Sequence, residues 1–156
     1  MKRILLTMAI GLLSTTALAQ APAQAQRPAP AAQKAAARDV DPNTLANTAL
    51  QLLQAIDRDQ AGALWDASSN VTKRSAKRED FVAYVGRTRK PLGTASLRSW
   101  IGVRREVVGN GAQLPPGLYA SIEFSSQFQG KRTAKELISL RRDEDGLWRF
   151  SGYVIQ

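Results

Sequence analysis

The feature that most constrains the fold is a change in hydrophobic period at Gly93. Before Gly93, apolar residues recur every three or four positions, which is typical of helices that pack by one face. After it, apolar and polar residues alternate, which is typical of strands with one buried face. Helices followed by strands predict an α+β domain, in which the helices pack on one face of an antiparallel sheet.

Three helices are expected in the first part of this domain. The dipeptide Asp41-Pro42 combines an N-cap with a proline at the first helical position, so a helix is expected to begin there and to end at 57–59. A second, short helix is expected over about 60–68. Ser75 is the expected N-cap of a third helix over about 76–88.

Four strands are expected after Gly93. They cover 97–108, 118–128, 134–140 and 147–155, and turns at Gln129-Gly130-Lys131 and Asp145-Gly146 separate the last three. In the first strand, Leu97, Ser99, Ile101 and Val103 are expected to share one face. We therefore predict three helices packed on a curved four-stranded antiparallel sheet.

The first nineteen residues have the pattern of a secretory signal peptide. Lys2 and Arg3 precede an apolar stretch over 4–13, and Ala17-Leu18-Ala19 supplies the small residues at which signal peptidase cleaves. The apolar stretch spans about 15 Å as a helix, half of a ~30 Å hydrocarbon core, so a membrane anchor is not expected.

The sequence thus predicts a signal peptide over 1–19, an Ala/Pro/Gln-rich spacer over 20–40 and one domain over 41–156. Cleavage is expected after Ala19, and the mature protein is expected in the periplasm or outside the cell.

The composition excludes several kinds of chemistry. The chain has no cysteine and no histidine, which removes thiol nucleophiles, thiolate metal sites and the commonest general base. No phosphate-binding loop, Gly-x-Ser-x-Gly elbow or calcium loop occurs in the sequence. We therefore expect no catalytic residue, no metal and no cofactor.

The chain is basic. Without Lys2 and Arg3 it carries 20 Lys and Arg against 13 Asp and Glu, a net charge of +7. The charges are scattered and lack the aromatic interleaving of a nucleic-acid surface, so no specific nucleic acid is expected. We interpret them as a solvated surface, with an anionic lipid or polymer as the alternative partner.

Two segments carry a resemblance to a known family. Arg89-Lys90-Pro91-Leu92-Gly93 and the ending Asp145-Gly146-Leu147-Trp148-Arg149 with Gly152-Tyr153 resemble the bacterial Domain of Unknown Function 4019 family, over about residues 45–155. The resemblance implies no activity, cofactor or catalytic residue. The family's element order is similar to the nuclear transport factor 2-like (cystatin-like) cone, in which helices close a curved sheet over a cavity. It therefore implies a pocket without identifying its occupant.

Glu136 is the candidate residue that most needs an explanation, because it shares a strand face with apolar neighbours. A buried carboxylate is costly unless it is paired. Arg98 in the first strand and Arg89 at the end of the third helix are the expected partners, in a lock between sheet and helices. Two alternatives stay open, which are a polar anchor inside a ligand cavity and a catalytic acid or base.

Three aromatic residues with a polar atom, Trp65, Tyr119 and Tyr153, are further candidates. Regular spacing favours packing in the core, and a mixed aromatic and polar cavity is the alternative. The function most favoured is non-enzymatic binding of a small apolar or amphipathic ligand, or of a protein. The alternatives are a small hydrolase or isomerase that uses Glu136 or an aspartate with a tyrosine, and an envelope protein held by charge to anionic lipid or polymer.

Overall fold

Four α-helices precede four strands in residues 40–156, the part of the chain that this computed structural model describes. The helices are α2 (Pro42–Asp57), α3 (Ala61–Asp66), α4 (Asn70–Ser75) and α5 (Arg78–Thr88), and the strands are β1 (Leu97–Val108), β2 (Gly117–Gln127), β3 (Thr133–Arg142) and β4 (Trp148–Ile155). The expected signal peptide, and the expected spacer up to residue 39, lie outside the described residues. Within the described part, no helix combines the length and the apolar content needed to cross a membrane.

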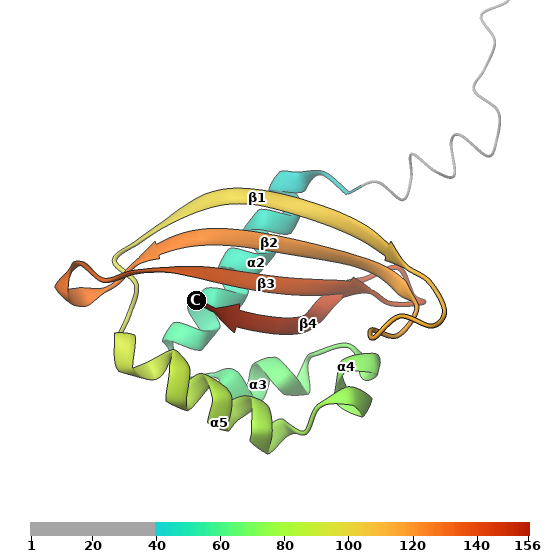
Figure 1. Cartoon of the computed structure of the whole chain (residues 1–156), viewed down its shortest axis with the longest axis horizontal. Helices are drawn as coiled ribbons and strands as arrows, with labels where there is room; N and C mark the ends of the chain where they lie inside the picture. The colour runs from blue at the N-terminus through green and yellow to red at the C-terminus, as the bar shows by residue number, and fades with distance from the viewer. Residues whose placement is uncertain (1–39) are drawn as a thin grey trace, which may run out of the picture. The chain divides into compact units, whose positions relative to one another are not determined.

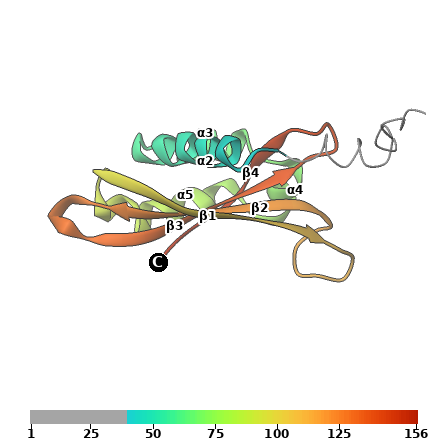
Figure 2. The ribbon, with the colours of Figure 1, turned by 90° about the horizontal axis from the view of Figure 1, so that it is seen from above.

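The strands form one open antiparallel sheet in the order β1-β2-β3-β4, so each strand pairs with its neighbours in sequence. The sheet arches, with α2 crossing behind it and α3, α4 and α5 lying along its β4 side (Figure 1). Seen from above, α2 lies on one side of the strands (Figure 2). The predicted α+β class, with N-terminal helices on a four-stranded antiparallel sheet, is confirmed.

Helix α2 begins where the sequence predicts it. The Asp41 carboxylate accepts a hydrogen bond from the backbone N–H of Asn43 (3.3 Å), and Pro42 occupies the first turn. One face of the helix is buried in the core, through Leu45, Ala49, Leu53 and Ile56. Full burial of a leucine or isoleucine contributes about 1.5–3 kcal/mol, so this face alone attaches α2 firmly to the sheet.

The inner face of the sheet supplies the other half of the core. Its buried apolar residues come from three strands and are Ala120, Ile122 and Phe124 in β2, Ile138 and Leu140 in β3, and Phe150 and Tyr153 in β4. In β2 and β3 every second residue points inward, which is the alternation that the sequence shows. In β4 the inward residues Phe150 and Tyr153 are three positions apart, because the register against β3 shifts between Ser139 and Leu140. Glu136 lies on this same inner face of β3 and is also buried.

The prediction of three helices with an N-cap at Ser75 is wrong. Ser75 is the last residue of an additional helix, α4, and the N-cap of that helix is Ser69, whose Oγ accepts a hydrogen bond from the backbone N–H of Val71 (3.3 Å). Helix α5 begins at Arg78, after Lys77. Val71 is the one buried residue of α4, and a single apolar residue leaves no periodic pattern to detect.

The predicted face of β1 is wrong in its first half. The register against β2 shifts between Trp100 and Gly102, which marks a β-bulge. Leu97 and Ile101 are therefore more than half exposed, whereas Arg98 reaches the buried Glu136. A bulge adds one residue to the strand, and simple alternation does not reveal it.

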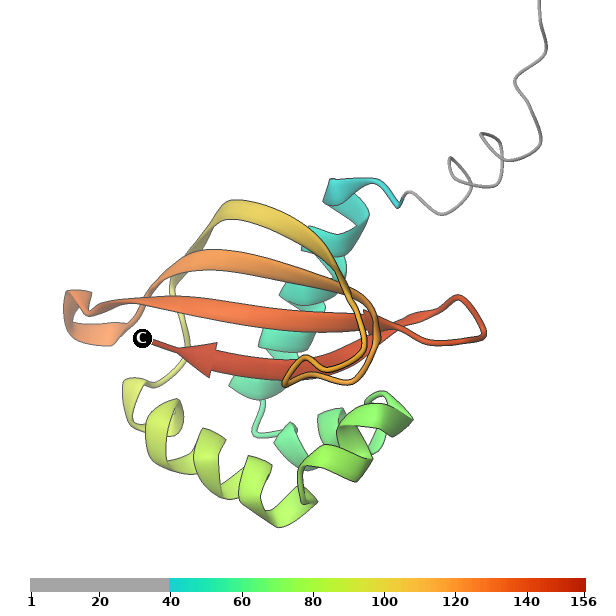
Figure 3. The same ribbon diagram turned by 45° about the vertical axis from the view of Figure 1, so that its right-hand side comes forward.

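The face of the sheet opposite α2 has no helix over it in residues 40–156 (Figure 3). Small and polar residues occupy its middle, including Ser121, Ser139 and Gly152. Glu123 and Lys135 form an exposed ion pair there (3.0 Å). The polarity of these positions explains why this face needs no cover.

Candidate functional site

The described residues contain two clusters of arginines and carboxylates. The first, which we call the Glu136 network, consists of Asp57, Arg89, Arg98, Ser126, Glu136 and Tyr153. The second, which we call the Asp143 cluster, consists of Ser69, Arg141, Asp143, Glu144, Asp145 and Arg149. The first is enclosed between helices and sheet, and the second borders a surface pocket.

Glu136 is completely buried, with 0% of its surface exposed, and four donors reach its carboxylate. Arg89 Nε (3.0 Å) and the Tyr153 hydroxyl (2.8 Å) donate to Oε1. Arg98 Nε donates to Oε2 (2.8 Å), and the Ser126 hydroxyl donates to the same oxygen. An ionised carboxylate has about four acceptor positions, so all of them are used within the protein.

Asp57, the last residue of α2, is the second carboxylate of the network. Arg98 donates to both of its oxygens, from Nη1 to Oδ2 (2.6 Å) and from Nη2 to Oδ1 (2.9 Å). Arg89 donates to Oδ1 from Nη2, and its guanidinium also lies 4.3 Å from the centre of the Phe128 ring. Each arginine therefore bridges both carboxylates, and the four charges sum to zero.

The pKa values in the network keep these charges in place. Burial opposes ionisation of Glu136, but the hydrogen bonds from Arg98, Ser126 and Tyr153 outweigh it, so the pKa of Glu136 lies below its ordinary value. Burial and the nearby Glu136 charge raise the pKa of the Tyr153 hydroxyl far above its ordinary value. Although burial opposes it, bonds to Asp57 and Glu136 raise the pKa of Arg98. Glu136 is thus a stable anion and a poor proton acceptor.

The network joins most of the fold. Its members come from α2, the C-terminal end of α5 and all four strands. A surface pocket of about 180 Å³ touches it at Asp57 and Arg89, and that pocket is not lined by Glu136 or Tyr153. These are the contacts that a structural lock between helices and sheet requires.

The other two aromatic candidates lie outside this network. The Tyr119 hydroxyl donates to the backbone oxygen of Pro115 (2.9 Å), which ties down the loop between β1 and β2. Trp65 is half-buried on α3, with the ammonium of Lys73 5.8 Å from its ring centre. The structure thus brings together Glu136, Arg89, Arg98 and Tyr153 but neither Tyr119 nor Trp65.

A pocket of about 490 Å³ lies where the segment 66–73 faces the turn between β3 and β4, and we call it the turn pocket. Its lining is almost wholly polar and consists of Asp66, Ala67, Ser68, Asn70, Lys73, Asp143, Glu144, Asp145 and Arg149. Four of these residues are acidic and two are basic.

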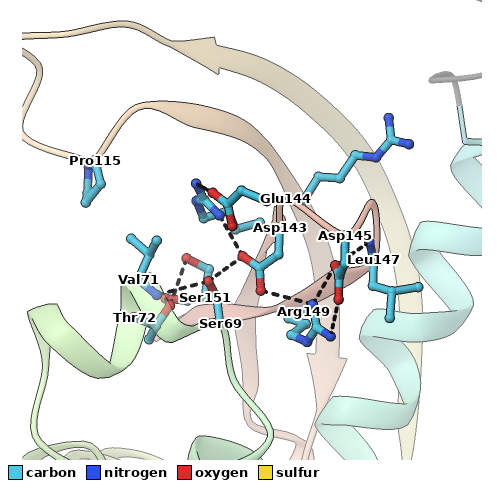
Figure 4. Close-up of polar contacts among 12 residues, drawn as sticks. Ser69, Val71, Thr72, Pro115, Asp143, Glu144, Asp145, Leu147, Arg149 and Ser151 are labelled. Carbon is cyan, nitrogen blue, oxygen red and sulfur yellow. Dashed lines mark hydrogen bonds and ion pairs between the residues drawn. The ribbon is translucent and has the colours of Figure 1, made fainter.

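Local structure sets the position of Asp143 in this pocket. The turn closes through a bond from the Gly146 N–H to the Asp143 carbonyl (2.9 Å), and Gly146 has φ 84°, a conformation that favours glycine. From the helical side, the Ser69 hydroxyl donates to Asp143 Oδ1 (2.6 Å), while Thr72 donates to the Ser151 hydroxyl (3.3 Å; Figure 4). The N-cap of α4 thereby also holds the turn.

Arginines neutralise the carboxylates around the pocket. Arg141 donates to Asp143 (2.6 Å) and to Glu144 (2.9 Å). Arg149 donates to Asp143 (3.1 Å) and makes two bonds to Asp145 (2.9 and 2.7 Å; Figure 4). The Arg149 bonds lower the pKa of Asp145 to about 2. Burial opposes ionisation of Asp143, but bonds from Ser69 and Arg141 lower its pKa overall.

Four buried side-chain polar atoms of the described residues lack a hydrogen-bond partner, and one of them belongs to a residue that lines this pocket. Within residues 40–156 they are Trp65 Nε1, Ser68 Oγ, Arg141 Nε and Trp148 Nε1. Ser68 lines the pocket itself, and Trp65 and Trp148 each precede a lining residue. Such atoms normally find a protein or water partner, so the Ser68 hydroxyl is unmet hydrogen-bonding capacity in the lining of the pocket.

Neither cluster has the donor set of a metal site. Among the described residues, no group of three or more acidic side chains is arranged to hold a metal ion. In both clusters the carboxylate oxygens accept hydrogen bonds from arginines, which takes up the lone pairs that a cation would need.

Both clusters fall within one region that a family model matches. The family described as Protein of unknown function (DUF4019) matches residues 48–153. The chain belongs to the DUF4019 family. The DUF4019 match spans all of β1, β2 and β3 and includes every member of the two clusters. No curated protein matches the chain.

Sequence reasoning missed parts of both clusters in this DUF4019 domain. Asp57 had the pattern of a helix end, and nothing local indicates that it pairs with Arg98 and Arg89. The turn residues 143–146 had the pattern of turn chemistry alone, because the pairing of Asp143 with Ser69 joins positions 74 residues apart. The one available signal was the density of charge, with Arg141, Asp143 and Arg149 close together in sequence.

Proposed function

We propose that this protein is an exported, non-enzymatic binding domain whose ligand site is the turn pocket. The observation that carries the proposal is a 490 Å³ polar pocket whose lining includes Ser68, a residue with a buried hydroxyl that has no partner. The volume lies within the range of about 300–1,000 Å³ that ligand pockets have. Export rests on the signal-peptide pattern of residues 1–19.

The lining of the pocket favours a polar ligand over the apolar or amphipathic one that a cone-type cavity suggests. The space between α2 and the sheet is occupied by side chains such as Leu53, Ile122 and Ile138, each fully buried. The turn pocket, in contrast, is lined by charged and hydrogen-bonding groups. An apolar ligand there would leave those groups without water or partners, which is unfavourable.

The charge balance favours an uncharged ligand. Asp143, Glu144 and Asp145 would repel an anion, while Arg141 and Arg149 neutralise those carboxylates and leave little attraction for a cation. The remaining capacity is mixed. Lys73 and Asn70 retain N–H donors. The exposed carboxylate of Glu144 accepts from Arg141 through Oε1 and retains further acceptor positions. Hydroxyl groups both donate and accept, so we infer a hydroxyl-rich ligand such as a mono- or disaccharide.

The absence of an enzymatic role is part of this proposal. The carboxylates of Asp143, Glu144 and Asp145 have lowered pKa values, so they are anions that neither donate protons nor accept them readily near neutral pH. The chain has no histidine to serve as a general base. Glu136 and Tyr153 meet in space, but their polar atoms are committed to each other and to arginines.

The test is a titration of the isotope-labelled protein with neutral mono- and disaccharides, followed by amide chemical shifts. We expect shifts to concentrate at 66–73 and 143–149, and to weaken in Asn70→Ala and Lys73→Ala. Asn47→Ala, on the exposed face of α2, is the matched control and should leave the shifts unchanged. Shifts confined to other surfaces, or no shifts with any sugar at millimolar concentration, would contradict the proposal.

Native mass spectrometry of protein expressed with its own N-terminus tests the same proposal without choosing a sugar. We expect cleavage after Ala19 and a retained uncharged molecule. A retained lipid or fatty acid would favour the apolar ligand instead.

A further inference from the structure

Strand β1 is an open edge of the sheet. It pairs with β2 on one side, and within residues 40–156 no strand pairs with its other side. Soluble proteins usually shorten, bend or charge such edges, because unpaired backbone groups recruit another strand. β1 has twelve residues, and Val107 on it is 79% exposed. This edge is therefore long and partly apolar.

The second half of β1, residues 102–108, is the part suited to pairing. The bulge lies before it, and from Gly102 to Val108 the register against β2 is unbroken. Arg104 and Glu106 share one face of this segment and are both exposed, while Val103 and Val107 share the other face. The segment thus carries one positive and one negative side chain two positions apart on the same face.

We propose that two copies of this protein pair antiparallel through residues 102–108, about a two-fold axis at Arg105. In that register Arg104 lies opposite Glu106 of the partner subunit, and Glu106 lies opposite Arg104 of the partner subunit. Val103 lies opposite Val107 of the partner subunit on the other face. Opposite charges and β-branched residues are both favourable cross-strand pairs, and the two sheets become one.

The pattern Arg104-x-Glu106 is the reason that we expect the strand pairing with this edge to come from a second copy of the protein. A strand of unrelated sequence has no need to match it, but an antiparallel two-fold matches it automatically and twice. The axis brings Arg105 opposite itself, which is the one unfavourable pair. The Arg105 guanidinium is drawn toward α2 and donates to the carbonyl oxygen of Val40 (3.1 Å), which takes it away from the axis.

The test is the self-association of the chain from Gln20 to Gln156, measured by sedimentation equilibrium over micromolar to millimolar concentrations. We expect a monomer–dimer equilibrium. Arg104→Glu or Glu106→Arg alone replaces two attractive pairs with two repulsive ones, so each should weaken dimerisation about tenfold or more. Matched charge changes at exposed positions of α5, Arg87→Glu and Glu79→Arg, should leave the dissociation constant unchanged.

Two charge-reversal experiments decide whether Arg104 and Glu106 pair across the interface. The double variant with both Arg104→Glu and Glu106→Arg restores two opposite-charge pairs and should dimerise like the wild type. An equimolar mixture of the two single variants should form a heterodimer, because each strand then meets its complement. Circular dichroism and thermal melting establish that every variant is folded. A wild type that stays monomeric at millimolar concentration, or a double variant as weak as the singles, would overturn the proposal.

Discussion

The Glu136 network and the Asp143 cluster contain the same kinds of side chain but differ in how much of their surroundings the chain fills. Each has two arginines shared between carboxylates, and in each a serine hydroxyl donates to the central carboxylate. In the Glu136 network the chain encloses the central carboxylate completely, and the donors match its acceptors. Around the Asp143 cluster the chain leaves a pocket of about 490 Å³, and the hydroxyl of Ser68 in its lining has no partner.

This difference suits the Glu136 network to stabilising the fold and the Asp143 cluster to binding. A closed, neutral network can hold six elements in place, but it offers nothing to a ligand, because a bond to a ligand would first require breaking a buried one. In the Asp143 cluster the pairs to Glu144 and Asp145 are exposed, so water screens them and they contribute less to stability, whereas the Arg141–Asp143 pair is enclosed. The open cluster keeps spare donors and acceptors, which is what recognition needs.

The largest effect is expected from Glu136→Gln. The amide removes the charge between two buried arginines and replaces one acceptor oxygen with a donor that faces them. Breaking one side of a buried ion pair typically costs about 3–5 kcal/mol. For a domain of this size, that lowers the melting temperature by of order ten degrees or more, which calorimetry would measure.

Glu123→Gln is the matched control for this substitution. Glu123 lies on the uncovered face of the sheet and pairs with the exposed Lys135 (3.0 Å). An exposed pair contributes about 0–1 kcal/mol, so this variant should melt close to the wild type. Equal melting of Glu136→Gln and wild type would mean that the carboxylate is solvated or serves a ligand, and the contrast between the clusters would disappear.

The next largest effect is the dependence of stability on pH, because folding lowers the pKa of Glu136 and raises the pKa of Tyr153. The folded protein lowers the pKa of Glu136 from its ordinary value of 4.5, so the unfolded chain binds more protons in acid. The stability from Glu136 is fully present above pH 4.5 and is lost as the pH falls through the folded value. The folded protein raises the pKa of Tyr153 from 10.0, so that contribution is present below pH 10 and is lost as the pH rises further.

Urea unfolding between pH 3 and pH 11 measures this dependence. We expect a plateau that ends near pH 5 on the acid side and near pH 10 on the alkaline side. Glu136→Gln should flatten the acid limb, and Tyr153→Phe should flatten the alkaline limb. If neither variant changes its limb, other groups dominate the titration, and the network is not the electrostatic centre of the fold.

The two clusters also differ in how far the sequence could predict them. Alternation indicated that Glu136 is buried, because it shares a face with apolar residues. Arg98 at the start of its strand and Arg89 at the end of its helix were then the expected partners. Asp57 could not be found in this way, because a carboxylate at a helix end is usually a local feature. Arg98 faces inward only because of the bulge after Trp100, so its partner was predicted correctly although the face of its strand was not.

The Asp143 cluster could not be predicted from the sequence, for a different reason. It depends on α4, a six-residue helix with one buried side chain, whose N-cap Ser69 reaches Asp143. Helix periodicity needs about three turns to be detected, so α4 left no signal. The polar composition of 143–146 fits a plain hairpin turn, and only its contact with the far segment 66–73 makes a pocket.

The smallest effect, and the most direct comparison, comes from two serine-to-alanine substitutions. Ser126 and Ser68 are both buried, at 0% and 3% exposure. Ser126 donates to Glu136, whereas Ser68 Oγ has no partner in the protein. A hydrogen bond to a charged group contributes about 1.5–3 kcal/mol, so Ser126→Ala should destabilise the domain by that order.

Ser68→Ala removes a hydroxyl that the folded protein leaves unsatisfied, so its free energy of unfolding should change by less than about 0.5 kcal/mol, or rise slightly. If the turn pocket binds a hydroxyl-rich ligand, the same variant should weaken binding of that sugar while the fold is intact. Ser126→Ala should show the reverse, with lower stability and unchanged affinity at temperatures where it is folded. A Ser68→Ala variant that loses as much stability as Ser126→Ala would mean that Ser68 is held by buried water as part of the fold. The turn pocket would then be a second lock rather than a site.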